Sequence, residues 1–157
     1  MEIKGILIED YINYKKPSML IKFPKCNFKC DKECGKLVCQ NSALAKSPNI
    51  QIAAETLVDM YIKNSFTSAI VCGGLEPMDS YKDLHLFIKE IRKKTLDDIV
   101  IYTGYTEEEL KNQLAYLRPY KKIIFKFGRY IPNQEPHFDE VLGVNLASDN
   151  QYGKVIS

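Results

Sequence analysis

The chain has 157 residues, of which 45% are hydrophobic and 27% are charged. This length and composition suit one globular domain with its own core, so we expect a single domain over residues 1–157. The formal net charge of +2 is too small to indicate a nucleic-acid-binding protein. No apolar run is long enough to cross a membrane, and the N-terminus lacks the features of a signal peptide. We therefore expect a cytoplasmic protein with neither membrane nor nucleic-acid partners.

The N-terminal third contains two apolar runs and then a dense group of cysteines. The runs are Ile3–Ile8 and Met19–Phe23, and a polar turn separates them. This pattern predicts a hairpin, or a short edge strand that leads into the first core strand. The next segment, residues 24–42, shows no helical or strand period and is called the cysteine loop below. It contains four of the five cysteines of the chain, namely Cys26, Cys30, Cys34 and Cys39.

After the cysteine loop, helices and short apolar strands alternate. Apolar residues at helical spacing predict three helices, which begin near Ala53, Ser80 and Thr106. An acid three residues after Ser80 and after Thr106 is typical of a capping box. Short apolar runs predict buried strands at Ser68–Cys72, Ile99–Tyr102 and Ile123–Phe127. Residues 141–146 are a candidate last strand, and the polar tail after them shows no pattern.

The alternation of strands and helices determines the expected fold. It predicts right-handed βαβ units and a mainly parallel sheet. Because there are too few units to close an eight-stranded barrel, we expect an α/β fold with an open or partial (β/α) barrel. In such folds the chemistry lies at the carboxyl ends of the strands. Here these ends carry the cysteine loop and three short motifs, at Gly73–Pro77, Tyr102–Tyr105 and Lys126–Arg129.

The cysteines favour an iron–sulfur cluster over a disulfide framework or a zinc site. Their odd number, in a chain with an adequate core, argues against disulfides. Zinc sites usually pair cysteines two residues apart, whereas the gaps here are three, three and four residues with no histidine nearby. A cluster accepts irregular spacing because the loop wraps around it. We expect Cys34 and Cys72 to be incidental, since Cys72 ends a buried strand where cysteine acts as a small apolar residue.

Several short motifs occur in a definite order along the chain. Cys26-x-x-x-Cys30 follows the first core strand, and Gly-Gly-x-Glu-Pro follows the next one at Gly73–Pro77. In these features the chain resembles the radical S-adenosylmethionine superfamily. It is similar in particular to the activating proteins of anaerobic ribonucleotide reductase, through Cys39-Gln-Asn41, Tyr102-Thr-Gly-Tyr-Thr-Glu107, Gly128-Arg-Tyr130 and Ser148-Asp-Asn-Gln151. The resemblance covers nearly the whole chain and implies a partial barrel of the radical S-adenosylmethionine type.

The resemblance implies a set of cluster ligands. A [4Fe-4S] cluster would bind to Cys26, Cys30 and Cys39. The third cysteine of the family usually follows the second by two residues, behind an aromatic residue. Here Cys39 follows much later and Val38 takes the place of the aromatic residue, which leaves Cys34 as a spare thiol in an enlarged loop. Leu75 is likewise an extra residue inside the Gly-Gly-Glu-Pro motif.

The resemblance also implies a binding site for S-adenosylmethionine. Its amino and carboxylate groups would bind the iron that has no protein ligand, and Glu76 would accept a hydrogen bond from the ammonium. Lys126 would pair with the carboxylate, although it is equally well explained as a surface lysine. The expected cofactor-binding residues are Asn41, Gly73, Gly74, Glu76, Pro77, Tyr102 and Lys126. The cluster and the cofactor carry the chemistry, so no further catalytic side chain is expected.

The implied function is that of an activase. It would reductively cleave S-adenosylmethionine to a 5′-deoxyadenosyl radical and place a glycyl radical on the large subunit of anaerobic ribonucleotide reductase. The chain has no second domain to enclose a small substrate, which suits a protein substrate. A flavodoxin- or ferredoxin-type electron donor is expected to dock on lysines of the loop. The alternatives are a small-molecule enzyme of the same superfamily, such as a deazaguanine-type synthase, and a non-catalytic zinc or redox module.

Overall fold

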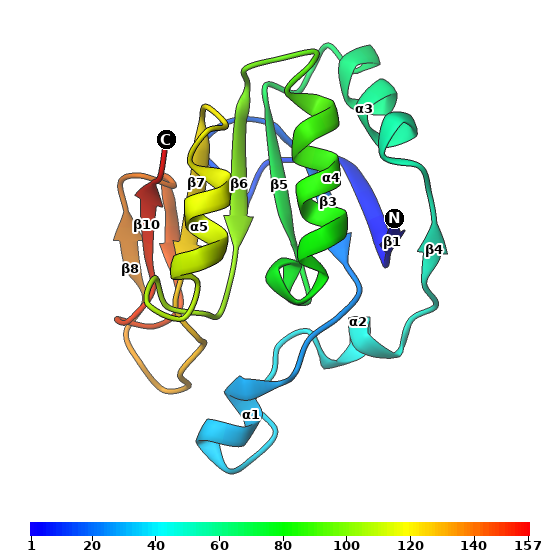
Figure 1. The fold of residues 1–157 in the computed structure, drawn as a ribbon. Helices are drawn as coiled ribbons and strands as arrows, with labels where there is room; N and C mark the ends of the chain where they lie inside the picture. The colour runs from blue at the N-terminus through cyan, green and yellow to red at the C-terminus, as the bar shows by residue number, and fades with distance from the viewer.

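The computed structural model describes residues 1–157 and contains one six-stranded sheet (Figure 1). In spatial order its strands are β10 (Tyr152–Val155), β7 (Ile123–Phe127), β6 (Asp98–Tyr102), β5 (Ala69–Gly74), β3 (Ser18–Phe23) and β2 (Gly5–Asp10). The four inner strands are parallel, and both edge strands are antiparallel to their neighbours. The predicted strands at the centre of the sheet and the predicted N-terminal hairpin are therefore confirmed.

The prediction of an open or partial (β/α) barrel with a mainly parallel sheet is wrong. The sheet is mixed and not closed, because β2 pairs only with β3 and β10 pairs only with β7. The helical crossovers join only four parallel strands, which is too few to close a barrel. The chain adds the two edges without such a crossover: β2 precedes β3 in a hairpin, and the polar tail returns as β10.

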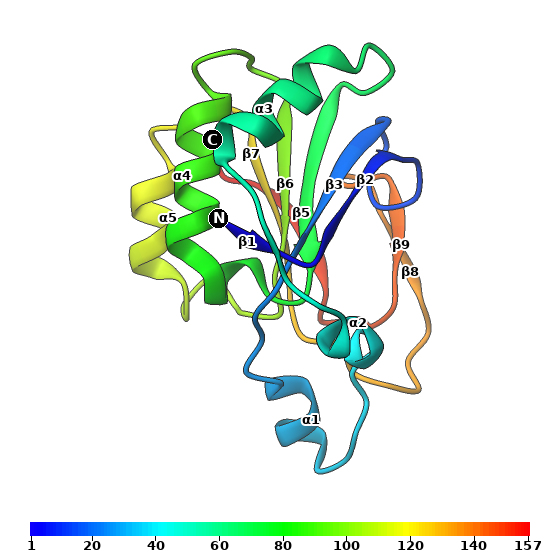
Figure 2. The same cartoon turned by 90° about the vertical axis from the view of Figure 1, so that its right-hand side faces the viewer.

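Three helices cover one face of the sheet (Figure 2). They are α3 (Ala54–Lys63), α4 (Tyr81–Ile91) and α5 (Lys111–Leu117). Their apolar residues pack with alternate residues of the inner strands in a core of 22 buried residues. On β5, Ile70 and Cys72 belong to this core, whereas Val71 points to the opposite face. The buried Cys72 thus acts as a small apolar residue, as expected.

The opposite face of the sheet is covered by a hairpin and a loop. The hairpin consists of β8 (His137–Asp139) and β9 (Val144–Leu146), so the candidate strand at 141–146 begins later than predicted. The loop is residues 11–16, between β2 and β3. Tyr14 of this loop packs against Val71 in a second, smaller core, and its hydroxyl donates to Asp98 at 3.0 Å. Residues on both faces of β5, β6 and β7 are therefore buried.

The remaining elements are short. β1 (Glu2–Ile3) pairs with β4 (Ile50–Gln51) in a separate sheet. The cysteine loop, which showed no period, forms α1 (Lys29–Cys34), and α2 (Ser42–Lys46) begins at its end. Both helices lie beyond the carboxyl ends of the inner strands (Figure 1). A 3₁₀ helix, η1 (Pro77–Ser80), precedes α4. No helix has both the length and the apolar character that a membrane span requires.

The two predicted capping boxes have different outcomes. Thr106 and Glu109 make the reciprocal backbone contacts, at 2.9 and 3.3 Å, although α5 begins only at Lys111. The box at Ser80 is wrong, because the Asp83 carboxylate accepts from the backbone N–H of Glu2 instead. The Ser80 hydroxyl has no partner. A long-range contact has replaced a local one, which a sequence pattern cannot indicate.

Two tyrosines of the loop 11–16 provide a test of how it covers the sheet. Tyr14 is 3% exposed and Tyr11 is 61% exposed. Because truncation of a buried aromatic side chain leaves a cavity, Tyr14→Ala should lower the free energy of unfolding by about 3–5 kcal/mol. The matched control Tyr11→Ala should change it by no more than about 0.5 kcal/mol. Urea unfolding of the apoprotein measures both values, and equal effects would contradict the described packing.

Candidate functional site

A cavity of about 540 Å³ lies at the carboxyl ends of the inner strands. One row of the sheet contributes to its lining. The strand register brings Lys22 beside Gly73 and Tyr102 beside Lys126, and Gly73 and Tyr102 are neighbours on β5 and β6. Because residues that are paired across neighbouring strands point to the same side of a sheet, these four side-chain positions share one face. Gly73 has no side chain, so the row has a gap between its lysines.

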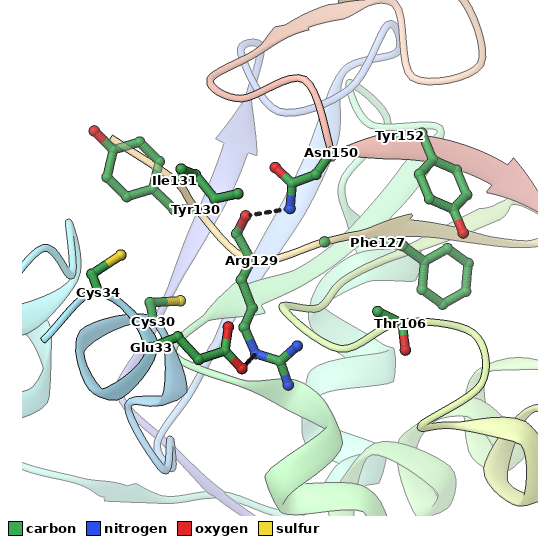
Figure 3. Close-up of a pocket in the computed structure, with 11 residues that line it drawn as sticks. Cys30, Glu33, Cys34, Thr106, Phe127, Arg129, Tyr130, Ile131, Asn150 and Tyr152 are labelled. Carbon is green, nitrogen blue, oxygen red and sulfur yellow. Dashed lines mark hydrogen bonds and ion pairs between the residues drawn. The ribbon is translucent and has the colours of Figure 1, made fainter. Parts of the chain in front are cut away.

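Three of the four cysteines in the cysteine loop line this cavity: Cys26, Cys30 and Cys39. Cys34 does not line it. Instead, Cys34 lines a second cavity of about 330 Å³ together with Cys30, Arg129 and Tyr130 (Figure 3). The three cysteines predicted as cluster ligands thus line one cavity, whereas the predicted spare thiol, Cys34, lines only the second cavity, which it shares with Cys30.

Six of the seven predicted cofactor-binding residues line the same cavity, namely Asn41, Gly73, Gly74, Glu76, Tyr102 and Lys126. Pro77 does not. It is buried at the first position of η1, where the fixed φ of proline favours a helix start. Lining residues that sequence reasoning missed include Lys22, Ile12 and Asn145. Strand alternation could have placed Lys22 on this face, whereas Ile12 and Asn145 come from segments without a recognisable pattern.

Glu76 is held in a fixed position at the end of β5. It is 7% exposed. Its Oε1 accepts from the backbone N–H of Met78 at 3.0 Å, and its Oε2 accepts from that of Gly104 at 2.8 Å. Burial raises the pKa of Glu76 to about 7, although these hydrogen bonds act in the opposite direction. The Tyr102–Tyr105 motif therefore supports Glu76 through the backbone of Gly104.

Lys126 is a buried cation in the wall of the cavity. Its Nζ donates to the backbone oxygen of Gly128 at 2.9 Å and lies 5.9 Å from the centre of the Tyr102 ring. Burial lowers the pKa of Lys126 to about 8, and the nearby Glu76 and Cys30 act in the opposite direction. The buried position excludes the alternative of an ordinary surface lysine. The cavity thus contains an acid and a base close to the thiols.

The two glycines of the Gly-Gly-x-Glu-Pro motif have different roles. Gly74 has φ +85°, and a Cβ at this position would lie 2.8 Å from the Cα of Lys22. Its backbone therefore requires glycine. A Cβ on Gly73 would make only ordinary contacts, the nearest at 3.5 Å to the Leu20 side chain. Packing does not require glycine at position 73, where the lack of a side chain leaves space in the cavity.

Comparison with protein families identifies the class of site. A family model described as a 4Fe-4S single cluster domain matches residues 19–139, which is most of the chain. The chain belongs to the 4Fe-4S single cluster domain family. Comparisons with curated proteins and with solved structures found no significant match. As a 4Fe-4S domain the protein is an iron–sulfur protein, which confirms the preference for a cluster over a disulfide framework or zinc.

The thiols of the 4Fe-4S domain have surroundings that fit a cluster. The backbone N–H of Phe28 donates to Cys26 Sγ at 3.3 Å. Such contacts orient sulfur ligands and tune the potential of a cluster. Burial raises the pKa of Cys26 to about 11 and also raises that of Cys30. Binding of the cluster must therefore release protons from these thiols.

The different positions of Cys34 and Cys39 predict different effects of their removal. Cys39→Ala should lose most of the iron that the wild-type 4Fe-4S domain binds, because a thiol facing the cavity is lost. Cys34→Ala should keep the wild-type amount. Iron and sulfide per chain after anaerobic reconstitution measure both effects. If Cys34→Ala abolished the bound iron and Cys39→Ala did not, the ligand assignment would be wrong.

Proposed function

We propose that this 4Fe-4S protein is a radical S-adenosylmethionine activase. The observation that carries the proposal is that three thiols of the cysteine loop and the Gly73–Glu76 segment line one cavity. The order of the motifs along the chain, which resembles that superfamily, supports the same reading. The cavity volume of about 540 Å³ also lies within the range of small-molecule sites, roughly 300–1,000 Å³.

In this proposal the thiolates of Cys26, Cys30 and Cys39 would hold the cluster. A bound cluster would supply the electron for reductive cleavage of the sulfonium bond of S-adenosylmethionine. The protein binds and orients the cofactor and excludes competing reactions. The backbone N–H of Phe28 orients the Cys26 thiol for this purpose.

Glu76 and Lys126 provide complementary charges for the methionine end of the cofactor. A carboxylate has about four acceptor sites, and Met78 and Gly104 occupy one on each oxygen of Glu76. The remaining acceptor sites can take hydrogen bonds from the ammonium. Lys126, at the far end of the row that contains Gly73, pairs with the carboxylate of S-adenosylmethionine. Asn41 and Tyr102 line other parts of the same cavity.

The proposed substrate is a glycine-containing loop of a protein. Ile12, which is 78% exposed, and Leu44 line the cavity and contribute apolar surface to it. A backbone segment inserted by a large partner would contact such surface. The resemblance indicates the large subunit of anaerobic ribonucleotide reductase as this partner.

The proposed electron donor is an acidic carrier of the flavodoxin or ferredoxin type. Lys25, Lys32 and Lys36 of the cysteine loop are exposed and form no ion pair. Four lysines of the loop stand against two acids, Asp31 and Glu33, and Glu33 pairs with Arg129. The loop therefore presents net positive charge that attracts an acidic partner.

Formation of 5′-deoxyadenosine tests the proposed activity. Anaerobically reconstituted protein, supplied with S-adenosylmethionine and a chemical reductant, should release 5′-deoxyadenosine and methionine. Cys34→Ala should retain this activity, and Cys39→Ala should lose it. If a fully loaded and reducible cluster gave no 5′-deoxyadenosine, the assignment to the superfamily would fail and a redox module would replace it.

The protein substrate is tested in the same system. Addition of the large subunit of anaerobic ribonucleotide reductase should produce the electron paramagnetic resonance doublet of a glycyl radical. A low-molecular-weight product formed without that subunit would instead favour a small-molecule enzyme such as a deazaguanine-type synthase.

The raised pKa of Glu76 predicts a pH dependence of cofactor binding. Glu76, whose nearest charged groups include Asp79 and Lys126, is neutral below its pKa of about 7, so its attraction for the amino group of the cofactor weakens as the pH falls through this value. Affinity for S-adenosylmethionine should therefore fall as the pH drops below about 7.

The matched variant for this prediction is Glu76→Gln. It should bind about tenfold more weakly at pH 7.5, because a contact to a charged group contributes about 1.5–3 kcal/mol. Its affinity for S-adenosylmethionine should also no longer fall as the pH drops below about 7. Isothermal titration calorimetry at each pH measures the affinity, with iron content determined in parallel to confirm equal loading. If the affinity of Glu76→Gln still fell below about pH 7, the pH dependence would belong to another group.

A further inference from the structure

The return of the chain from Cys30 to Cys39 needs an explanation. Eight residues separate the two cysteines. α1 ends at Cys34, Gly35 turns the chain with φ 66°, and Leu37 is 93% exposed. α1 itself has no buried residue. Apolar packing therefore does not bring Cys39 back to the cavity.

The carboxylate of Asp31 holds the chain where it returns to the cavity. Oδ1 of Asp31 accepts hydrogen bonds from the backbone N–H of Val38 at 2.6 Å and from that of Cys39 at 2.8 Å. Hydrogen bonds to a charged acceptor are among the stronger ones in proteins. Because Asp31 directly follows Cys30, a single side chain ties the second thiol of the predicted ligand set to the third.

We infer that Asp31 is the positioning residue that closes the enlarged cysteine loop and places the Cys39 thiol at the cavity. This inference rests on the proposed ligand role of Cys39, but it is independent of S-adenosylmethionine chemistry. A second consequence follows from the charge of Asp31. A negative charge close to a cluster lowers its reduction potential, since net charge is one of the factors that set this potential.

Glu33 provides a matched control on the same helix. It carries the same charge two residues away, and its side chain is 57% exposed. Its carboxylate pairs with Arg129 at 3.3 Å and makes no hydrogen bond to the backbone of the cysteine loop (Figure 3). Exposed ion pairs of this kind contribute little to stability. Removal of Glu33 therefore tests a loss of charge without a loss of loop closure.

The experiment compares Asp31→Ala, Asp31→Asn, Glu33→Ala and Cys39→Ala with the wild-type full chain. After anaerobic reconstitution, iron loss to a chelator measures cluster retention. Asp31→Ala should retain its cluster about 10- to 100-fold less well, as for other residues that support a metal ligand. Asp31→Asn should retain its cluster far better than Asp31→Ala and close to the wild type, because the amide oxygen of asparagine still accepts both hydrogen bonds, although more weakly than a carboxylate. Glu33→Ala should behave as the wild type, because Glu33 makes no bond to the loop backbone.

Two further measurements separate positioning from a general structural effect. Apoprotein thermal unfolding should be unchanged in all four variants, because α1 contributes nothing to the buried core. Redox titration of the loaded Asp31→Asn variant should give a higher midpoint potential than the wild type, since the charge is lost while the geometry is kept. Glu33→Ala should shift the potential less, because its exposed charge is screened by solvent.

The outcomes are distinct. If Asp31→Ala kept its cluster as well as the wild type while Cys39→Ala lost it, the positioning role would be overturned. Equally poor retention in Asp31→Ala and Asp31→Asn would also overturn it, because the preserved acceptor would then be without effect. If Cys39→Ala itself kept the cluster, the proposed ligand set would fail, whatever the behaviour of the Asp31 variants.

Discussion

The register of the four parallel strands is the constraint on which the site depends. Backbone pairing places Lys22 beside Gly73 and Tyr102 beside Lys126, all on one face and at the carboxyl ends. The same pairing places alternate residues of β5, β6 and β7 in two different cores, so a shift of one residue would exchange the side chains of the two faces. The stability of the fold and the shape of the cavity thus have one physical origin. Gly74, whose Cβ position would collide with the backbone of β3, shows how closely the strands approach there.

The centre of the fold could be predicted from the sequence, but its edges could not. β5, β6 and β7 are short apolar runs between helices with an apolar stripe, and this combination has few solutions besides a parallel sheet. β10 is the opposite case. Its residues, Tyr152–Val155, form a mostly exposed edge and therefore show no hydrophobic pattern. Without that strand the sheet was expected to continue in parallel toward a partial barrel, whereas the antiparallel edge ends it.

Similar reasoning explains which site residues could be found. Cys26, Glu76 and Lys126 follow or end strands, and the carboxyl ends of parallel strands meet at one edge, so their positions follow from the topology. Asp31 could not be found in this way. Its role depends on the path of the loop between Cys30 and Cys39, which contains a helix of six residues, a left-handed glycine and an exposed leucine. Local sequence patterns do not determine where such a path returns, and only the hydrogen bonds to Val38 and Cys39 reveal it.

The core of 22 buried residues includes none from residues 24–42. In many small metalloproteins the metal supplies the free energy of folding, and removal of the metal unfolds the chain. In this protein the body of the domain can fold before any iron arrives, because its core does not depend on the cysteine loop. Destruction of the cluster by oxygen would accordingly leave a folded chain that can be loaded again. Assembly and repair of the centre are then steps that the protein can undergo repeatedly during its lifetime.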